Sequence, residues 1–403
     1  MTTLKKGSKA HDFSAVHAAM RRYIDNNILA GVSCAVLSGR DLLDVHCVGH
    51  ADKEAGTPMR EDTLFRAFSN TKLVTTLAAL LLLEEGHFQL DDPIERFIPA
   101  LAKRQVLRPG ATRIDDTEPA RSAITIRQLM SHSSGLSYGL LDPGTLHFTA
   151  YTEHKVLSPL NTLEQMMQAL APLPLASQPG TRWEYSVASD VLARLVEVVS
   201  GQRFDAFLRS RILGPLEMVD THFFVPGKDM PRLAAMYAGE TPNSPMAPGL
   251  KRAADWPYPG AFTVPVPSLS GGGGLVTTLP DMVALLRSLL PGGRTLLKPE
   301  TIALMMSNQL PEGVTIRFPM VGPVPGKVFG LGGAITVTPG RVDPPGSVGE
   351  FEWGGIGGTH WWINPRHNIA GLAMTQRQFG FWHPFSFEFK RLAYEALGRT
   401  SPA

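Results

Sequence analysis

Two side chains that could together carry out acyl transfer, Ser69 and Lys72, lie three positions apart in the only Ser-x-x-Lys sequence of the chain. They stand at the start of an apolar run that extends to Leu83 and ends at Gly86, which predicts a buried helix closed by a glycine. Because positions i and i+3 share one face of a helix, the Lys72 amine should reach the Ser69 hydroxyl. Backbone N–H groups of a first helical turn lack partners within the helix, so they could also stabilise an oxyanion. The alternative is a serine that only caps the helix and a lysine on its surface.

Two further segments could complete such a centre. Tyr185 follows a Pro-Gly loop and immediately precedes the amphipathic segment Val187–Ser200, so its phenol could point into a cleft; the alternative is a half-buried packing tyrosine. In the segment Glu352–Trp362, Gly354 and Gly355 weaken a strand unless something must approach its backbone closely. An edge strand with bare glycines would offer free N–H groups to a carbonyl oxygen, whereas the alternative is a bulge or a hairpin turn.

A competing nucleophile is Ser137, which stands in the Gly-x-Ser-x-Gly sequence of residues 135–139. That sequence is typical of α/β-hydrolases only when a strand precedes it and a helix follows it. Here a short helix is predicted before it, over Thr125–His132, and an irregular segment with Pro143 and Gly144 follows. We therefore interpret Ser137 as a non-catalytic residue.

The helix and strand patterns of the chain predict an α+β fold. In it, an antiparallel sheet is flanked by helices and carries an inserted, mostly helical lobe. Strand-like runs lie near both ends of the chain, whereas helical patterns dominate between Ser69 and Met218. We expect residues 1–68 and 265–403 to form the lobe with the sheet, residues 69–264 to form the helical lobe, and the active site to lie between them. The predicted elements are helices Phe13–Asn27, Leu279–Leu290 and Phe385–Leu397, strands Gly31–Leu37, Leu42–Gly49, Val328–Val337, Val348–Ile356, His360–Asn364 and Asn368–Thr375, and a long loop Tyr237–Ser270 over the surface or a cleft.

The composition excludes several classes of protein. With 403 residues, 43% hydrophobic and 18% charged, the chain is typical of globular proteins with two lobes. A net charge of +2 gives no basic field for nucleic acid. The basic stretch Met1–Lys9 is not followed by the apolar core of a signal peptide, and no run is long enough to span a bilayer, so we expect a cytoplasmic protein without a membrane partner. The oligomeric state cannot be read from the sequence.

The two cysteines, Cys34 and Cys47, fall in consecutive strand-like runs. If the turn between the strands centres on Arg40 and Asp41, the two thiols face each other, and we interpret them as small buried side chains. Whether they ever pair stays open. Because Cys and His do not cluster with metal-ligand spacing, we expect no zinc site.

Taken in order, these segments resemble the serine β-lactamase and penicillin-binding-protein superfamily, and specifically the family VIII carboxylesterases related to class C β-lactamases. The resemblance spans nearly the whole chain. It is carried by the following segments: Met59–Arg66, Ser69–Lys72, Leu90–Ile94, Ile126–Leu136, Pro179–Gly180, Tyr185–Ser186, Ser270–Leu275 and Trp353–Gly355.

Two departures from the β-lactamase pattern bear on the substrate. Val187 stands where β-lactamases carry an Asn, and Trp353-Gly354-Gly355 replaces their Lys-Thr-Gly. The missing lysine is the cation that would hold a carboxylate, and an indole cannot replace it. Trp-Gly-Gly is typical of the esterase branch and implies an apolar, uncharged acyl or alcohol group.

By this resemblance, Ser69 is the nucleophile, Lys72 is the general base, and Tyr185 relays the proton to the leaving group. The oxyanion would lie between the N–H groups of Ser69 and Ile356. The resemblance implies that no cofactor or metal is required. The implied reaction is hydrolysis of short-chain, uncharged esters of small molecules. The expected walls of the substrate site are Trp353, Gly354, Gly355, Tyr138, Trp183 and the segment Phe148–Tyr151.

Three alternatives remain open. An acyltransferase would use the same residues to pass the acyl group to an alcohol or amine. A β-lactamase or peptidase with weak β-lactam activity would share the fold. A non-catalytic binding or sensor protein would keep the fold, but such proteins typically lose Ser, Lys or Tyr, and all three are present here.

Overall fold

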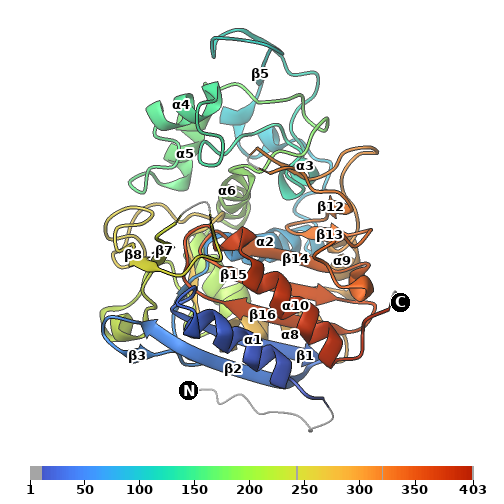
Figure 1. Cartoon of the computed structure of the whole chain (residues 1–403). Helices are drawn as coiled ribbons and strands as arrows, with labels where there is room; N and C mark the ends of the chain where they lie inside the picture. Colours follow the sequence, from blue (N-terminus) through green and yellow to red (C-terminus); the bar gives the residue numbers. More distant parts are fainter. Residues whose placement is uncertain (1–10, 242–243, 320, 402–403) are drawn as a thin grey trace.

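An eight-stranded antiparallel sheet built from both ends of the chain forms the centre of the computed structural model, which describes residues 11–241, 244–319 and 321–401 (Figure 1). The basic stretch Met1–Lys9 lies outside the described residues. Strand β16 pairs with β1, so the C-terminal half of the sheet continues directly into the N-terminal half. In spatial order the strands are β12 (Lys327–Phe329), β13 (Ala334–Thr336), β14 (Phe351–Gly355), β15 (Thr359–Asn364), β16 (Ile369–Met374), β1 (Gly31–Ser38), β2 (Asp41–Asp52) and β3 (Thr57–Pro58).

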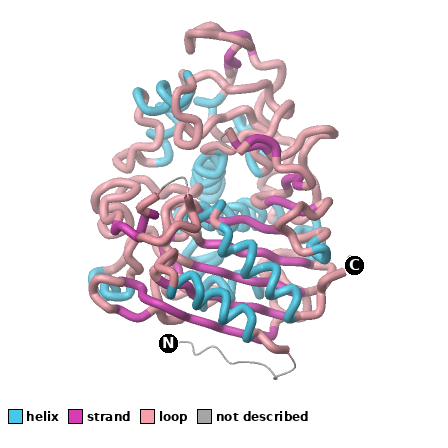
Figure 2. The backbone as a smooth tube through the Cα atoms, viewed as in Figure 1, coloured by secondary structure: helices cyan, strands magenta, loops and turns pink. Residues whose placement is uncertain are grey.

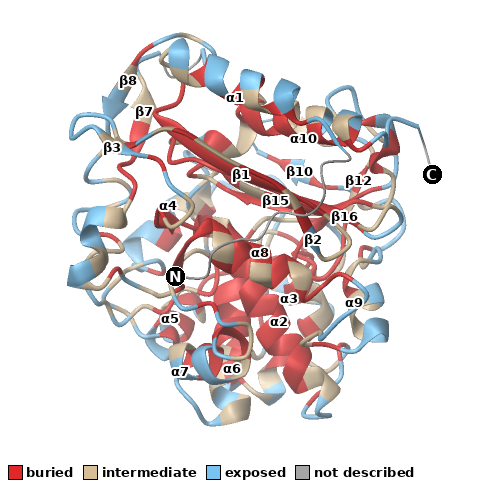
Figure 3. Cartoon of the chain, turned by 90° about the horizontal axis from the view of Figure 1, so that it is seen from below, coloured by how far each residue is buried: buried red, intermediate tan, exposed pale blue. Residues whose placement is uncertain are grey.

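Helices cover both faces of the sheet, and Figure 3 shows this arrangement, with α1 and α10 on one side and α2 and α8 on the other. Strand β1 is therefore buried along nearly its whole length and reads as a continuous small and apolar run. The two faces belong to separate cores: Cys34 and Val36 pack under α1 and α10, while Ala35 and Leu37 join the larger core on the other side.

The helices are shorter than the sequence patterns predict, because caps and turns take up residues at their ends. The C-terminal helix, for example, begins at Pro384 and ends at Ala396. The helices are α1 (Ser14–Asp25), α2 (Thr71–Glu84), α3 (Ile126–Met130), α4 (Leu146–Glu153), α5 (Leu163–Leu170), α6 (Ala188–Ser200), α7 (Phe204–Leu208), α8 (Leu279–Arg287), α9 (Pro299–Met305) and α10 (Pro384–Ala396).

Outside the sheet, the middle of the chain is made of helices and long loops with a few short strand pairs (Figure 2). Strand β4 pairs with β9 just before the Ser-x-x-Lys sequence, so two distant segments meet there. The pairs are β4 (Phe65–Arg66) with β9 (Val276–Thr277), β5 (Gln105–Leu107) with β6 (Thr117–Pro119), β7 (Tyr237–Gly239) with β8 (Leu250–Arg252), and β10 (Arg317–Phe318) with β11 (Gly322–Pro323). The antiparallel sheet with flanking helices confirms the predicted fold class; the lobe boundaries stay a prediction.

Three local predictions are wrong. The run Val328–Val337 is not one strand but the hairpin of β12 and β13, because Gly332 adopts a φ of 83° and turns the chain against helix α2. Strand β14 begins only at Phe351, since a 3₁₀ turn occupies Pro345–Ser347. The cysteines do not face each other: Cys34 lies opposite His46, because the turn centres one residue earlier than expected and a bulge follows Val36.

The predicted loop Tyr237–Ser270 contains the short β7–β8 hairpin and otherwise lacks regular structure. Its Trp256 and Phe262 rings lie 4.9 and 5.3 Å from the ring of Phe68, the residue before Ser69. The loop therefore packs against the turn that carries the predicted nucleophile.

Candidate active site

Ser69 lies in a 3₁₀ turn, Phe68–Asn70, that leads directly into α2, so the predicted helix starts two residues later than expected. Phe68 has a φ of 46°, a left-handed conformation that costs energy for a bulky residue. The rings of Trp256 and Phe262 pack against its side chain and hold it in place. This turn leaves the Ser69 side chain half-buried at the wall of a pocket.

Lys72 is buried because α2 runs through the core and has no solvent-facing side over its first twelve residues. Its side-chain nitrogen, Nζ, lies 3.3 Å from the Ser69 Oγ. The same Nζ donates a hydrogen bond of 2.7 Å to the backbone oxygen of Gly272. The same Nζ lies 4.6 Å from the centre of the Tyr185 ring and 5.3 Å from that of Tyr138. The lysine is therefore enclosed by polar and aromatic groups that fix its position.

Tyr185 completes the arrangement from the loop before α6. Its hydroxyl donates a hydrogen bond of 2.6 Å to the Ser69 Oγ. Two backbone hydrogen bonds, from Glu184 to His132 and from Val187 to Ser137, hold the loop on either side of it. The structure thus brings Ser69, Lys72 and Tyr185 together around one oxygen atom, although they come from two separate segments of the chain.

Aromatic rings hold the Tyr185 ring in position. Tyr138 stacks on it at 5.3 Å with an interplanar angle of 16°, and Trp183 stacks at 6.0 Å. The indole nitrogen Nε1 of Trp353 lies 3.4 Å from the Tyr185 hydroxyl and donates to it. Each of these three was predicted to line the substrate site, but only Tyr138 and Trp353 reach the pocket wall, while Trp183 is buried behind Tyr185.

Buried ionisable groups surround the site. Burial raises the pKa of Asp190, although hydrogen bonds and the charge of Lys72 oppose the shift. The Asp190 Oδ1 accepts hydrogen bonds from the Ser270 hydroxyl (2.7 Å) and from the Gly272 N–H (3.1 Å), so it holds the segment whose carbonyl contacts Lys72. Burial and the charge of Lys72 lower the pKa of His132 well below its usual range, and this imidazole is therefore neutral.

Strand β14 contains two glycines in close contact with their neighbours, and Gly355 packs against the turn that carries Ser69. A Cβ on Gly355 would lie 2.5 Å from the Ala67 backbone oxygen, so only glycine lets the strand pack against the turn that carries Ser69. The predicted close approach is therefore to the protein's own backbone. A Cβ on Gly354 would lie 2.6 Å from the His360 ring on the neighbouring strand. Ile356 follows the strand and lines the same pocket as Ser69.

The prediction that the glycines lie on an edge strand is wrong for β14 as a whole, because the strand lies between β13 and β15. Strand β13 pairs only with Phe351 and Glu352, however, whereas β15 pairs with all five residues of β14. Over Trp353–Gly355, then, the described pairing lies on one side of the strand alone. This half of the strand is open towards the pocket in the way that the glycine pattern predicts.

The pocket beside Ser69 has a volume of about 70 Å³ and apolar walls. The sequence analysis identified Ser69, Tyr138, Tyr185, Trp353, Gly354 and Ile356 in its wall and missed the others: Phe68, Leu140, Leu141, Gly272, Gly273, Phe318, Phe381 and Trp382. The run of four glycines from Gly271 was a visible signal for two of them, but nothing local marks the rest. The segment Phe148–Tyr151 does not reach the wall, because Tyr151 turns inward and bonds the backbone N–H of Ser137.

The residues that the structure describes lack two kinds of feature. No helix in these residues is both long and apolar enough to cross a membrane. Within the same residues, no group of three or more His, Cys, Asp or Glu side chains is arranged to hold a metal ion.

Known proteins resemble the chain over nearly its full length. Residues 16–390 match the sequence model of the family described as Beta-lactamase. Esterase EstB of Burkholderia gladioli is 30% identical over 378 residues, which cover 91% of each chain. Lovastatin esterase of Penicillium rubens is 34% identical over 337 residues, 79% of this chain and 81% of the relative. The solved structure of EstCE1, described as a hydrolase with promiscuous acyltransferase activity, superposes with a TM-score of 0.80 at 27% identity, covering 94% of this chain and 98% of the other.

Proposed function

Because this chain belongs to the beta-lactamase family, among its family VIII esterases, we propose that it is a serine carboxylesterase that hydrolyses short-chain, uncharged esters through an acyl-enzyme on Ser69. One observation carries the proposal: the Ser69 Oγ has both the Lys72 amine and the Tyr185 phenol within hydrogen-bond distance. A serine is a weak nucleophile until a neighbouring base accepts its proton, and both candidate bases are in contact with this one.

In the first half of the reaction, the Ser69 oxygen attacks the ester carbonyl while its proton passes to the unprotonated amine of Lys72. The carbonyl oxygen then carries a negative charge, which the N–H groups of Ser69 and Ile356 stabilise. The bond to the alcohol oxygen breaks, and the departing alkoxide takes a proton from Tyr185. Lys72, whose Nζ lies 4.6 Å from the centre of the Tyr185 ring, then returns its proton to the phenolate, and both residues regain their starting state.

In the second half, water attacks the acyl-enzyme and gives one proton to the Lys72 amine, and Tyr185 relays that proton to the departing Ser69 oxygen. Ser69 leaves with a proton, and the carboxylic acid is released. The small size of the pocket, about 70 Å³ between apolar walls, supports short acyl groups.

Trp353 supports the restriction to uncharged esters. It stands where β-lactamases carry the lysine of Lys-Thr-Gly, and its indole N–H is directed to the Tyr185 hydroxyl. A neutral donor cannot replace the cation that would pair with the carboxylate of a β-lactam.

The experiment that tests this proposal is a panel of p-nitrophenyl esters of rising acyl length, assayed beside nitrocefin. We expect kcat/KM to be largest for acetate or butyrate, to fall for long acyl chains, and to be very low for nitrocefin. A kcat/KM for nitrocefin equal to that for the best ester would contradict the argument from Trp353.

Acyl transfer is a second candidate, and the apolar pocket favours it because water is poorly held there. EstCE1 is described as having this activity beside hydrolysis, and the same residues would serve both reactions. Product analysis with and without an added alcohol distinguishes them: transfer gives a new ester, whereas hydrolysis gives only the acid.

A further inference from the structure

A second cavity adjoins the active-site pocket across a wall of aromatic rings. Its volume is about 160 Å³, more than twice that of the pocket beside Ser69. Phe318, Trp353, Phe381 and Trp382 line both, and we call these four residues the aromatic partition. Their rings pack edge to face or tilted, with centres 5.3 Å apart for Trp353 and Phe381 and 5.6 Å apart for Phe318 and Trp382. The second cavity is therefore the space next to the active site on the Trp353 side.

The position of Trp353 indicates which half of an ester faces this cavity. Its Nε1 lies 3.4 Å from the Tyr185 hydroxyl, which in the proposed mechanism gives a proton to the departing alkoxide. The alcohol oxygen must then lie beside Tyr185, and the rest of the alcohol group extends towards the aromatic partition. The acyl group, attached to Ser69, stays in the smaller pocket.

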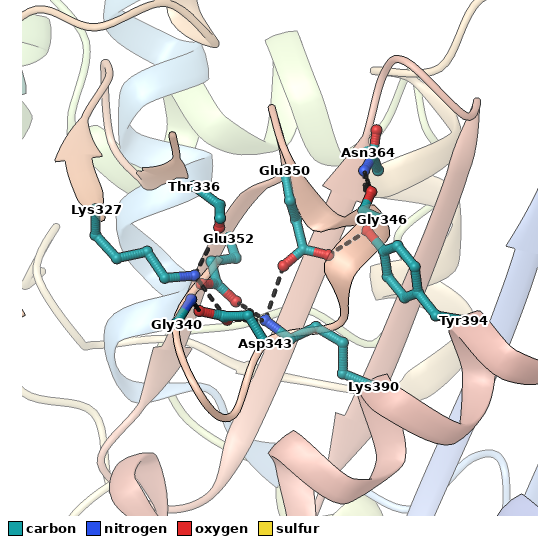
Figure 4. Close-up of polar contacts among 10 residues, drawn as sticks. All are labelled: Lys327, Thr336, Gly340, Asp343, Gly346, Glu350, Glu352, Asn364, Lys390 and Tyr394. Atoms are coloured by element: carbon teal, nitrogen blue, oxygen red, sulfur yellow. Dashed lines mark hydrogen bonds and ion pairs between the residues drawn. The ribbon is translucent and has the colours of Figure 1, made fainter. Parts of the chain in front are cut away.

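One end of the second cavity is polar. Lys327, Glu352 and Lys390 line it, and they belong to a buried charge cluster that also contains Asp343, Glu350 and Tyr394 (Figure 4). The Lys327 ammonium bonds Thr336, Asp343 and Glu352, and the Lys390 ammonium bonds Asp343, Glu350 and Glu352. An ammonium group has three protons, so each lysine already uses all of its donors within the cluster.

The carboxylates of the cluster differ from the lysines, because each oxygen has more than one lone pair and can accept a further hydrogen bond. Burial opposes ionisation of Glu352, but the charges of Lys327 and Lys390 outweigh it and lower the pKa of this carboxyl, so it is an anion. Burial raises the pKa of Glu350 to about 7. The cluster thus offers acceptors to a ligand in the cavity, repels a ligand carboxylate, and has no lysine proton left to bind one.

The two tryptophans of the cavity wall add no donors to it. Trp361 and Trp362 are neighbours on strand β15, so their side chains lie on opposite faces of the sheet and belong to different cores. A Cβ on Gly371 of strand β16 would lie 2.8 Å from the Nε1 atom of Trp362, and the Trp361 ring packs against Phe351. The cavity therefore combines apolar walls with unused hydrogen-bond acceptors.

We propose that the second cavity binds the alcohol part of the ester, an apolar ring or branched chain that ends in a hydroxyl group. A hydroxyl donates a hydrogen bond, so it fits the unused lone pairs of the Glu352 carboxylate at the polar end of the cavity. This inference rests on the proposed esterase function and adds to it the class of alcohol that the enzyme prefers.

Three acetate esters that differ only in one substituent test the inference on the wild-type protein. They are 2-phenylethyl acetates with hydrogen, hydroxyl or carboxylate at the para position. Because the acyl group is the same, differences in kcat/KM for acetate release report only the alcohol side. We expect the order hydroxyl, hydrogen, carboxylate, with about tenfold or more between the first and the last, as a gained hydrogen bond and an added charge repulsion would give. Equal kcat/KM values for the three esters would overturn the inference.

A pair of matched variants locates the effect. Val324 lines the second cavity, whereas Val219 is 70% exposed and lies elsewhere. In Val324→Trp the added ring fills the cavity, so we expect the ratio of kcat/KM for the para-hydroxyl ester over that for ethyl acetate to fall at least about fivefold. In Val219→Trp the ratio should stay at the wild-type value, and a ratio that is unchanged in both variants would place the alcohol group elsewhere.

Different results would contradict the alcohol site and the esterase activity. If ethyl acetate is hydrolysed with dependence on Ser69 but the para substituent has no effect, the inference fails and the proposed function stands. If no ester is hydrolysed with dependence on Ser69, both fail.

Discussion

Ser69 and Ser137 both stand in short sequences that are typical of catalytic serines, yet their surroundings differ completely. Ser69 is half-buried at a pocket wall, and its oxygen contacts the Lys72 amine and the Tyr185 phenol. Ser137 is 2% exposed, and its hydroxyl donates to the Asp142 carboxylate at 3.2 Å. Because Ser137 is buried and its hydroxyl is bonded to Asp142, this serine is not accessible to a substrate.

The backbone explains the difference. Gly135 has a φ of 82°, and a Cβ there would lie 2.2 Å from the Ser177 backbone oxygen. Gly139 likewise has a positive φ and lies against the side chain of Tyr151. The glycines around Ser137 thus allow tight packing of loops, whereas the α/β-hydrolase pattern uses them for a turn between a strand and a helix. A serine in such a motif can act as a nucleophile only through the groups that the fold places around it.

The largest expected effect is the loss of the Ser69 hydroxyl. We expect Ser69→Ala to lower kcat/KM for p-nitrophenyl acetate by roughly 10³-fold or more, because no acyl-enzyme can form. Steady-state rates measure this directly, and Ser137→Ala, which should retain most of the activity, is the matched control. Retained activity in Ser69→Ala with loss in Ser137→Ala would reverse the comparison.

Removal of the Lys72 amine should have the next largest effect. Lys72→Met keeps a side chain of similar length but cannot accept the Ser69 proton, so we expect a loss at or beyond the upper end of about 10²–10⁴-fold in kcat. The buried oxygen of Gly272 also loses its donor. A thermal unfolding scan should accompany the kinetics, because only a folded variant with low activity supports a role for the amine as base.

Tyr185→Phe removes one hydroxyl and leaves Ser69 and Lys72 in place, so its effect should be smaller than that of Lys72→Met. We expect a loss of about 10²–10⁴-fold in turnover, the usual contribution of acid–base help. Intact-protein mass spectrometry after mixing with an activated ester should still detect a slowly formed adduct on Ser69. Turnover equal to that of the wild type would exclude Tyr185 from the chemistry.

The smallest expected effect is a loss of stability on weakening the hydrogen bond between Ser137 and Asp142. Asp142→Asn weakens the hydrogen bond from Ser137 and leaves the three residues around the Ser69 oxygen intact. We expect a decrease of about 1 kcal/mol in the free energy of unfolding, the usual net value of such a bond, with kcat/KM within about threefold of the wild type. Denaturant titration beside the ester assay measures both, and a large loss of activity at unchanged stability would show that Ser137 and Asp142 take part in the reaction.

Local sequence was sufficient for the parts of the site that lie within one element. Helix α2, with Lys72 in its first turn and Ser69 in the 3₁₀ turn before it, follows from an apolar run closed by a glycine. The amphipathic run up to Ser200 predicts the helix that supports Tyr185. The alternation of apolar strands near the two chain ends, together with the helical middle, was enough to predict one antiparallel sheet with an inserted helical region. These signals depend on residues that are neighbours in the chain, so periodicity alone detects them.

The tertiary structure alone decided what lies between elements that are distant in the sequence. The Gly272 carbonyl comes within 2.7 Å of Lys72 across 200 positions, and Phe318, Phe381 and Trp382 reach the pocket from segments that carry no motif. Single aromatic residues in a sequence do not reveal which face or cavity they will line, because packing of whole elements fixes those contacts. Local patterns therefore predict a candidate nucleophile and the class of fold, while the walls of the pocket and the second cavity beyond the aromatic partition depend on how the sheet, the helices and the loops pack.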